Sequence, residues 1–141
     1  RAAPADVDAL VDLVLRALTK MDTGGVRISV DRIEATAKRL ISDPSSLVLV
    51  SGEIDGAIAV QVSDAMFFER KVAGIVFWHA ERGNGHVLLR QALRWSKRRP
   101  AIKAVGLSMD FVSTDFGEGA RVGKLLELTG LKRRGSVHAE Y

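Results

Sequence analysis

The chain has 141 residues, of which 47% are hydrophobic and 27% are charged, and its formal net charge at pH 7 is +4. This size and balance are those of one soluble globular domain and exclude an intrinsically disordered chain. The sequence has no cysteine, which excludes disulfides, thiolate metal sites and a cysteine nucleophile.

The first half of the chain predicts two helices. Apolar residues recur at helical spacing over residues 4–18, where Pro4 stands at a favourable helix start. A second helix is expected to start at Asp31, with Glu34 completing a capping box, and to end before Pro44. No apolar run approaches the ~20 residues of a membrane span and no signal peptide opens the chain, so we expect a cytoplasmic protein without a membrane partner.

Three strands are expected next. Residues 47–50 and 57–62 are rich in β-formers and are joined by the turn sequence Asp55-Gly56, which predicts a hairpin. A loop over residues 64–70 precedes an apolar strand over 72–79. The aromatic part of that loop, Met66-Phe67-Phe68, either shapes an acceptor pocket or closes an edge of the core.

The second half alternates helices and strands. A helix is expected over residues 87–95, a strand over 102–111, a helix over 120–129 and a final strand over 136–141. This order predicts an α/β (α+β) fold in which helices cover a sheet. Because the chain begins with Arg1 and not Met, the sequence leaves open whether a further strand precedes it.

The segment of greatest interest joins the strand at 72–79 to the helix that follows it. Its loop reads Arg82-Gly83-Asn84-Gly85. A glycine turn at the start of a helix directs free N–H groups and the positive end of the helix dipole toward one point, which suits a phosphate. The alternative is a tight connection with no ligand.

These residues resemble the GNAT superfamily of N-acetyltransferases over nearly the whole chain. The family's phosphate-binding motif, Arg/Gln-x-x-Gly-x-Gly/Ala, is matched by residues 82–87 except that Val87 replaces the last small residue. Residues 1–6, 53–56 and 120–131 are also similar to family features, and Trp95 before a basic run is similar to a phage-type subgroup. The resemblance implies one acyl-CoA-binding domain over residues 1–141, with a mixed, mostly antiparallel sheet flanked by helices and acetyl-CoA as a substrate.

The resemblance also implies which residues hold that substrate. Backbone amides near residues 77–79 would polarise the thioester carbonyl and bind the pantetheine arm, and the glycine loop would bind the diphosphate. The implied set is Phe77, Trp78, His79, Arg82, Gly83, Asn84, Gly85, His86 and Val87, with Arg121 and Lys124 near the phosphates.

Acetyl transfer to an amine needs a base and an acid. The family's acid is a tyrosine of the closing helix, and Leu126 stands at that position; the only tyrosine here is Tyr141. His79 is the candidate base because an unperturbed histidine, with a pKa of about 6.5, accepts a proton near neutral pH. Glu81 and Asp110 are weaker alternatives, since each carboxylate would need a raised pKa. No metal site is predicted, because the three histidines lack carboxylates at ligand spacing.

Two further functions stay open at this stage. The missing tyrosine favours a catalytically inactive GNAT-fold module with a protein partner. One form of this alternative is a part of a phage or bacterial assembly, and a phage protein would lie in the host cytoplasm or the virion. Nucleic-acid binding through the basic runs 97–99 and 132–134 is disfavoured because they are not interleaved with aromatic residues. The sequence does not specify the amine acceptor or the oligomeric state.

Overall fold

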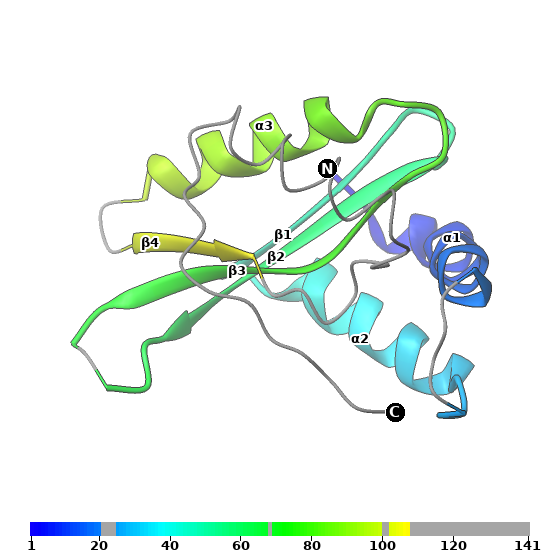
Figure 1. The fold of residues 1–141 in the computed structure, drawn as a ribbon, viewed down its shortest axis with the longest axis horizontal. Coiled ribbons are helices and arrows are strands. Elements are labelled where there is room, and N and C mark those ends of the chain that lie inside the picture. The colour runs from blue at the N-terminus through cyan, green and yellow to red at the C-terminus, as the bar shows by residue number, and fades with distance from the viewer. Residues whose placement is uncertain (21–24, 68, 100–101, 108–141) are drawn as a thin grey trace.

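The computed structural model describes residues 1–20, 25–67, 69–99 and 102–107 of the chain. The elements along these residues are η1 Pro4–Asp6, α1 Val7–Thr19, α2 Val30–Ser42, β1 Ser46–Val50, β2 Gly56–Asp64, β3 Lys71–Ala80, α3 Gly85–Lys97 and β4 Ile102–Leu107 (Figure 1). The expected order is confirmed as far as β4. The helix expected over 120–129 and the strand expected over 136–141 lie outside the described residues.

The described strands form one sheet in the order β1-β2-β3-β4. β2 is antiparallel to β1 and to β3, whereas β3 and β4 are parallel. A parallel pair requires a crossover connection, and α3 provides it between β3 and β4. The mixed, mostly antiparallel sheet implied by the sequence resemblance is therefore present.

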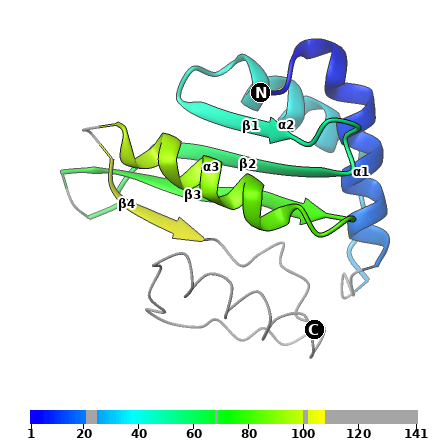
Figure 2. The same ribbon diagram turned by 90° about the horizontal axis from the view of Figure 1, so that it is seen from above.

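Each face of the sheet has its own apolar core. α3 packs on one face, where Leu89 and Ile58 are fully buried. α1 and α2 cover the other face, where Leu13 is fully buried. Figure 1 shows α3 and α2 on opposite sides of the sheet, and Figure 2 shows α3 lying along β2 and β3. None of the helices within the described ranges has the length and apolar content needed to cross a membrane.

The start of α2 differs from the expectation. The helix begins at Val30, and its cap is Ser29, whose hydroxyl oxygen accepts a hydrogen bond from the backbone N–H of Arg32 at 3.3 Å. Asp31, the expected cap, lies inside the first turn of the helix. A serine hydroxyl satisfies a helix-start N–H as well as a carboxylate does, and Ser29 stands two residues earlier, so the helix starts before the expected position.

α3 is held to the sheet by a stripe of apolar residues at helical spacing. Leu88, Leu89, Ala92 and Leu93 are all buried against the strands. Because this stripe begins within the first turn of the helix, the packing fixes the helix start beside the end of β3. The loop that carries the glycines is therefore anchored on both sides.

Candidate functional site

The second half of β3 has a partner on one side only among the described strands. Within the described residues, pairing with β4 reaches Ile75 and Leu107, whereas pairing with β2 continues to Ala80. The β2 register shifts at Val76, since Ile75 pairs with Val60 and Phe77 with Ala59. Such a bulge bends a strand and changes the direction of its side chains and edges. Residues 76–80 therefore present an edge that β4, as far as it is described, leaves open.

The N–H groups on that open edge can be identified from the strand's alternation. The N–H of Glu81 donates to the carbonyl of Asp55 at 2.9 Å, on the hairpin side of β3. Alternate residues of a strand direct their N–H groups to opposite edges. The N–H groups of Trp78 and Ala80 consequently face away from β2, on the edge that the described β4 does not cover.

The two glycines of the loop have different structural roles. Gly83 has φ +75°, and a Cβ added there would meet no atom within 4 Å, so glycine is needed for the backbone conformation and leaves open space. Gly85 lies tightly against β3: an added Cβ would be 3.3 Å from both the Ala80 Cβ and the Trp78 Nε1. The Trp78 indole also donates to the Gly85 carbonyl at 3.1 Å. Gly85 thus allows α3 to start in contact with the strand.

The start of α3 offers hydrogen-bond donors to a ligand. The N–H groups of Val87 and Leu88 donate to the carbonyl of Asn84 at 3.1 and 3.4 Å. For the N–H groups of Gly85 and His86, the described residues provide no acceptor. Free N–H groups at the positive end of a helix dipole attract an anion. The His86 ring lies over the turn, with Nδ1 3.1 Å from the Gly83 carbonyl oxygen.

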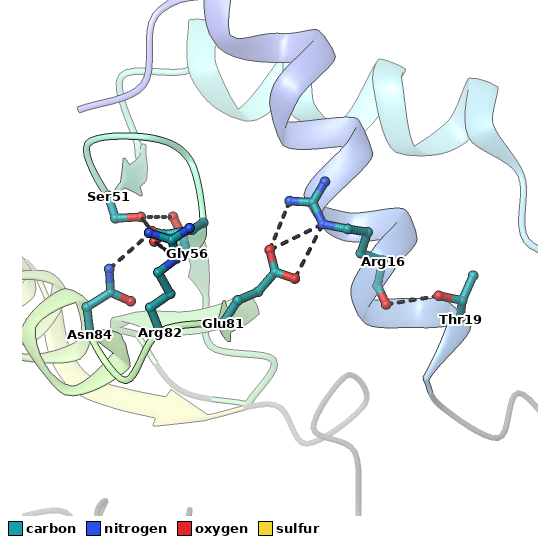
Figure 3. A network of polar contacts seen from close by, with 8 residues as sticks. Arg16, Thr19, Ser51, Gly56, Glu81, Arg82 and Asn84 are labelled. Atoms are coloured by element: carbon teal, nitrogen blue, oxygen red, sulfur yellow. Dashed lines mark hydrogen bonds and ion pairs between the residues drawn. The ribbon is translucent and has the colours of Figure 1, made fainter.

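A polar network joins this loop to the β1–β2 hairpin. The carboxylate of Asp55 accepts hydrogen bonds from the Ser51 hydroxyl and from Asn84 Nδ2, and it lies 3.5 Å from Arg82 Nε (Figure 3). The Ser51 hydrogen bond is the main cause that lowers the pKa of Asp55 below its ordinary value, with Asn84 and Arg82 adding to it. Asp55 is therefore a carboxylate held in its charged form beside the loop.

A second ion pair connects α1 with the end of β3. Arg16 Nη2 donates to Glu81 Oε1 at 2.9 Å, and Arg16 Nε donates to the same oxygen at 3.2 Å (Figure 3). The hydrogen bond from Arg16 lowers the pKa of Glu81 below its ordinary 4.5. A general base would require the opposite shift, so the structure argues against Glu81 as a base.

Stability should depend on pH through this ion pair. The pKa of Glu81 is lower in the folded protein than in the unfolded chain. The ion pair therefore adds to the free energy of unfolding above pH 4.5, and this stabilisation is lost as the pH falls through the pKa of the folded protein. We expect Arg16→Ala to lower the melting temperature by roughly 2 °C at pH 7 and by much less near pH 3. Thermal denaturation at both pH values measures this, with Lys38→Ala, which removes an exposed pair within α2, as the control. A pH-independent difference would contradict the assignment.

The three predicted residues near the end of β3 do not share a face of the sheet. Phe77 and His79 lie on the α1–α2 side, with ring centroids 6.4 Å apart, whereas the Trp78 ring lies on the α3 side. His79 is half-buried and pairs with Ala57 of β2. These residues can therefore act together on one ligand only through their backbone, while His79 alone presents an ionisable group on its face.

The structure brings the predicted loop residues together and leaves others apart. Residues 82–87 form one continuous turn and helix start. Arg121, Lys124, Leu126 and Asp110 lie outside the described residues. Met66 and Phe67 are 86% and 81% exposed at the opposite end of β3 from the turn. Such exposure argues against closure of a core edge by these two side chains, and the acceptor-pocket alternative stays a prediction.

Sequence reasoning missed Ser51, Asp55 and Arg16 as neighbours of the turn. Asp55 was interpreted only as a turn former, although a carboxylate at a hairpin tip can also reach a neighbouring loop. Arg16 and Glu81 are separated by 65 positions, and no local pattern signals their contact.

Comparisons with known proteins identify the fold. No model of a protein family matches the chain, and no curated protein matches it. Solved structures do match. One is a possible acetyltransferase from Clostridium difficile 630, with TM-score 0.71 and 13% identity, covering 99% of this chain and 93% of that one.

Two further solved structures carry names that bear on ligands. A predicted acetyltransferase from Clostridium acetobutylicum, solved with acetyl-CoA, has TM-score 0.68 and 14% identity and covers 99% of this chain and 92% of its own. An aminoglycoside acetyltransferase from an uncultured soil metagenomic sample has TM-score 0.64 and 16% identity, covering 99% and 91%. The chain therefore has the fold of the GNAT-type acetyltransferases, as its sequence resemblance implies.

Proposed function

We propose that this chain is an N-acetyltransferase that binds acetyl-CoA along the open edge of β3 and transfers the acetyl group to an amine. The observation that carries the proposal is the continuity of this edge with the start of α3. The outward N–H groups of Trp78 and Ala80 are followed directly by the glycine turn and by the N–H groups of Gly85 and His86. An extended arm that ends in a diphosphate matches such a path.

Each part of acetyl-CoA would meet a suitable group. The pantetheine arm would pair with the edge of residues 77–79 as an added strand does, which requires no particular side chain. The diphosphate would lie against the helix start and the turn of residues 82–87, where Gly83 leaves room for close approach. We further assign Arg121 and Lys124 to the phosphates on the strength of the sequence resemblance.

The proposed reaction is direct acyl transfer. The neutral amine nitrogen attacks the thioester carbonyl carbon and the C–S bond breaks. The thiolate leaves as CoA after it takes up the proton that the nitrogen releases when the amide forms. An N–H of the β3 edge would stabilise the negative charge that develops on the carbonyl oxygen. We propose that His79, the ionisable group at the end of β3, accepts the proton of the attacking amine.

Two of the matched structures support this choice of ligand. One is described with acetyl-CoA and the other as an acetyltransferase of aminoglycosides, which are amines. At 14% and 16% identity, however, these names describe those proteins, and the acceptor of this chain has to be found by experiment.

A second candidate function is a non-catalytic module. The sequence has leucine at position 126, where the family's acid tyrosine would stand, and its one tyrosine is Tyr141. Such a protein would keep the fold and a weak CoA site, and it would serve as a protein-interaction part. The two candidates differ in whether a bound thioester is ever consumed.

A calorimetric titration with acetyl-CoA, followed by a thiol-release assay with a panel of amines, tests both candidates. We expect saturable one-to-one binding, and free CoA at a rate that depends on the amine. Binding without amine-dependent thiol release favours the non-catalytic module. No binding at millimolar acetyl-CoA would contradict the acetyltransferase proposal.

A further inference from the structure

The hairpin turn between β1 and β2 holds a strained residue. Ile54 has φ 55°, in the left-handed region that β-branched residues avoid. Its N–H donates to the Ser51 carbonyl at 2.9 Å, and the Ser51 N–H donates to the Gly56 carbonyl at 3.0 Å. Its side chain packs against the core cluster on the α1–α2 face. The backbone hydrogen bonds and the packing of the Ile54 side chain thus hold the turn in place. They also hold Asp55, the next residue, in its position.

Asp55 connects this rigid turn to the start of α3. Its side chain is 21% exposed, and its carboxylate accepts a hydrogen bond from the Ser51 hydroxyl on the hairpin side. On the loop side, Asn84 Nδ2 donates a hydrogen bond to the carboxylate at 3.3 Å, and Arg82 Nε lies 3.5 Å from it. One carboxylate therefore fixes two side chains of the turn that we propose to bind a diphosphate.

The contact with Asn84 is unusual for a residue in this position of a helix. Asn84 is the residue that caps α3, and a capping asparagine normally accepts a hydrogen bond from an N–H of the first turn. Here its side chain makes no such bond: its amide nitrogen is turned to Asp55, and its backbone, at φ −90° and ψ 6°, is not in the extended conformation of a usual cap. The Asn84 side-chain oxygen is buried and has no hydrogen-bond partner among the described residues. The N–H groups that it would otherwise occupy, that of His86 among them, stay available.

The contact with Arg82 leaves most of its donors available as well. Asp55 faces the Nε atom, and the side chain of Arg82 is 73% exposed. For the two terminal nitrogens of the guanidinium, the described residues supply no acceptor. A guanidinium held through one nitrogen loses less freedom when its other nitrogens bind an anion.

We propose that Asp55 is a positioning residue of the diphosphate site, which keeps the Asn84 side chain off the first N–H groups of α3 and orients Arg82 beside them. This inference rests on the proposed binding of acetyl-CoA and deepens it. Asp55 itself, being negatively charged, does not contact the ligand. Without Asp55, the Asn84 oxygen is free to turn and cap the helix, and it would then compete with the ligand for the same donors.

The proposed competition between the Asn84 oxygen and the ligand predicts how each variant binds acetyl-CoA. We expect Asp55→Ala to raise the dissociation constant for acetyl-CoA roughly tenfold, which corresponds to 1.4 kcal/mol. Asn84→Ala alone should raise it less than Asp55→Ala does, because Asp55 still orients Arg82 in this variant and no competing cap is present. In the double variant Asp55→Ala/Asn84→Ala the competing cap is gone, so part of the lost affinity should return. A purely structural role for Asp55 would make the two losses add.

Two further variants complete the experiment. Asp55→Asn keeps the size of the side chain and an oxygen acceptor, so it should keep the hydrogen bond from Asn84 and lose only the ion pair with Arg82. Its affinity for acetyl-CoA should lie between those of the wild type and Asp55→Ala. Asp64→Ala removes the carboxylate that pairs with Lys71 at 2.9 Å, at the other end of β2 and β3, and should leave binding unchanged. Thermal denaturation of every variant verifies that it is folded.

The titrations are made with acetyl-CoA and with inorganic pyrophosphate. If the wild type binds while Asp55→Ala binds equally well, or if the double variant binds more weakly than either single variant, the inference is wrong and the proposed function stands. If the wild type binds neither compound, the proposed function is wrong and the inference falls with it. Partial recovery in the double variant supports the inference.

Discussion

Acetyl-CoA is expected to lose its stabilising effect on the protein when Gly85 is replaced by Glu. At a ligand concentration 100 times its dissociation constant, binding should raise the free energy of unfolding of the wild type by about 2.7 kcal/mol. In Gly85→Glu a side chain would start 3.3 Å from Ala80 and Trp78, and its carboxylate would lie beside the proposed diphosphate. We expect affinity to fall by more than about 100-fold and the thermal shift to disappear.

His86→Glu separates the effect of charge from the effect of crowding. His86 is exposed in the first turn of α3, where an acidic residue favours the helix dipole. This variant should therefore keep its stability without ligand and still lose the shift. Met66→Glu adds the same charge at an exposed position remote from the turn and should respond to acetyl-CoA as the wild type does. A normal shift in His86→Glu would show that the diphosphate binds elsewhere.

His79→Ala should lower kcat by roughly 100-fold at pH 7 while the dissociation constant for acetyl-CoA stays within about twofold. The reason is that the acceptor amine carries an extra proton at pH 7 and must lose it before its nitrogen can attack, whereas binding of acetyl-CoA does not involve that proton. Steady-state thiol release with a saturating amine measures kcat, and calorimetry measures the binding. His79→Gln keeps the volume of the side chain and should behave in the same way.

The pH dependence provides the control for His79. When the pH exceeds the pKa of the acceptor, the amine arrives without the proton, so the difference between wild type and His79→Ala should shrink. A loss of equal size at all pH values would assign His79 a structural role. An unchanged kcat at pH 7 would require another base or a water-mediated route.

Much of the fold could be predicted because its signals are local. The helical spacing of apolar residues identified α1 and α3, and Asp55-Gly56 with flanking β-formers identified the first hairpin. The start of α2 was placed at Asp31 because Asp31 and Glu34 have the spacing of a capping box, although Ser29 is the residue that caps it. Helix ends depend on single hydrogen bonds, so they are less predictable than helix interiors.

The candidate site could be predicted only in part. Residues 82–87 are contiguous, and their glycine pattern marks them as a turn before a helix. Asp55 has partners both in its own hairpin and in the loop. Asn84, its partner in the loop, is 29 positions away in the sequence, and no local pattern signals this contact. Likewise, the register of the described pairing between β3 and β4 is a long-range property that no residue type signals.

The edge of β3 beyond Val76 has a consequence for how such chains diverge. A surface that recognises its ligand by main-chain donors imposes no selection on residue identity beyond the ability to form a strand. Mutations can then accumulate along it while the shape is retained. The matched structures share the fold of this chain, with TM-scores of 0.64 to 0.71, at only 13% to 16% identity.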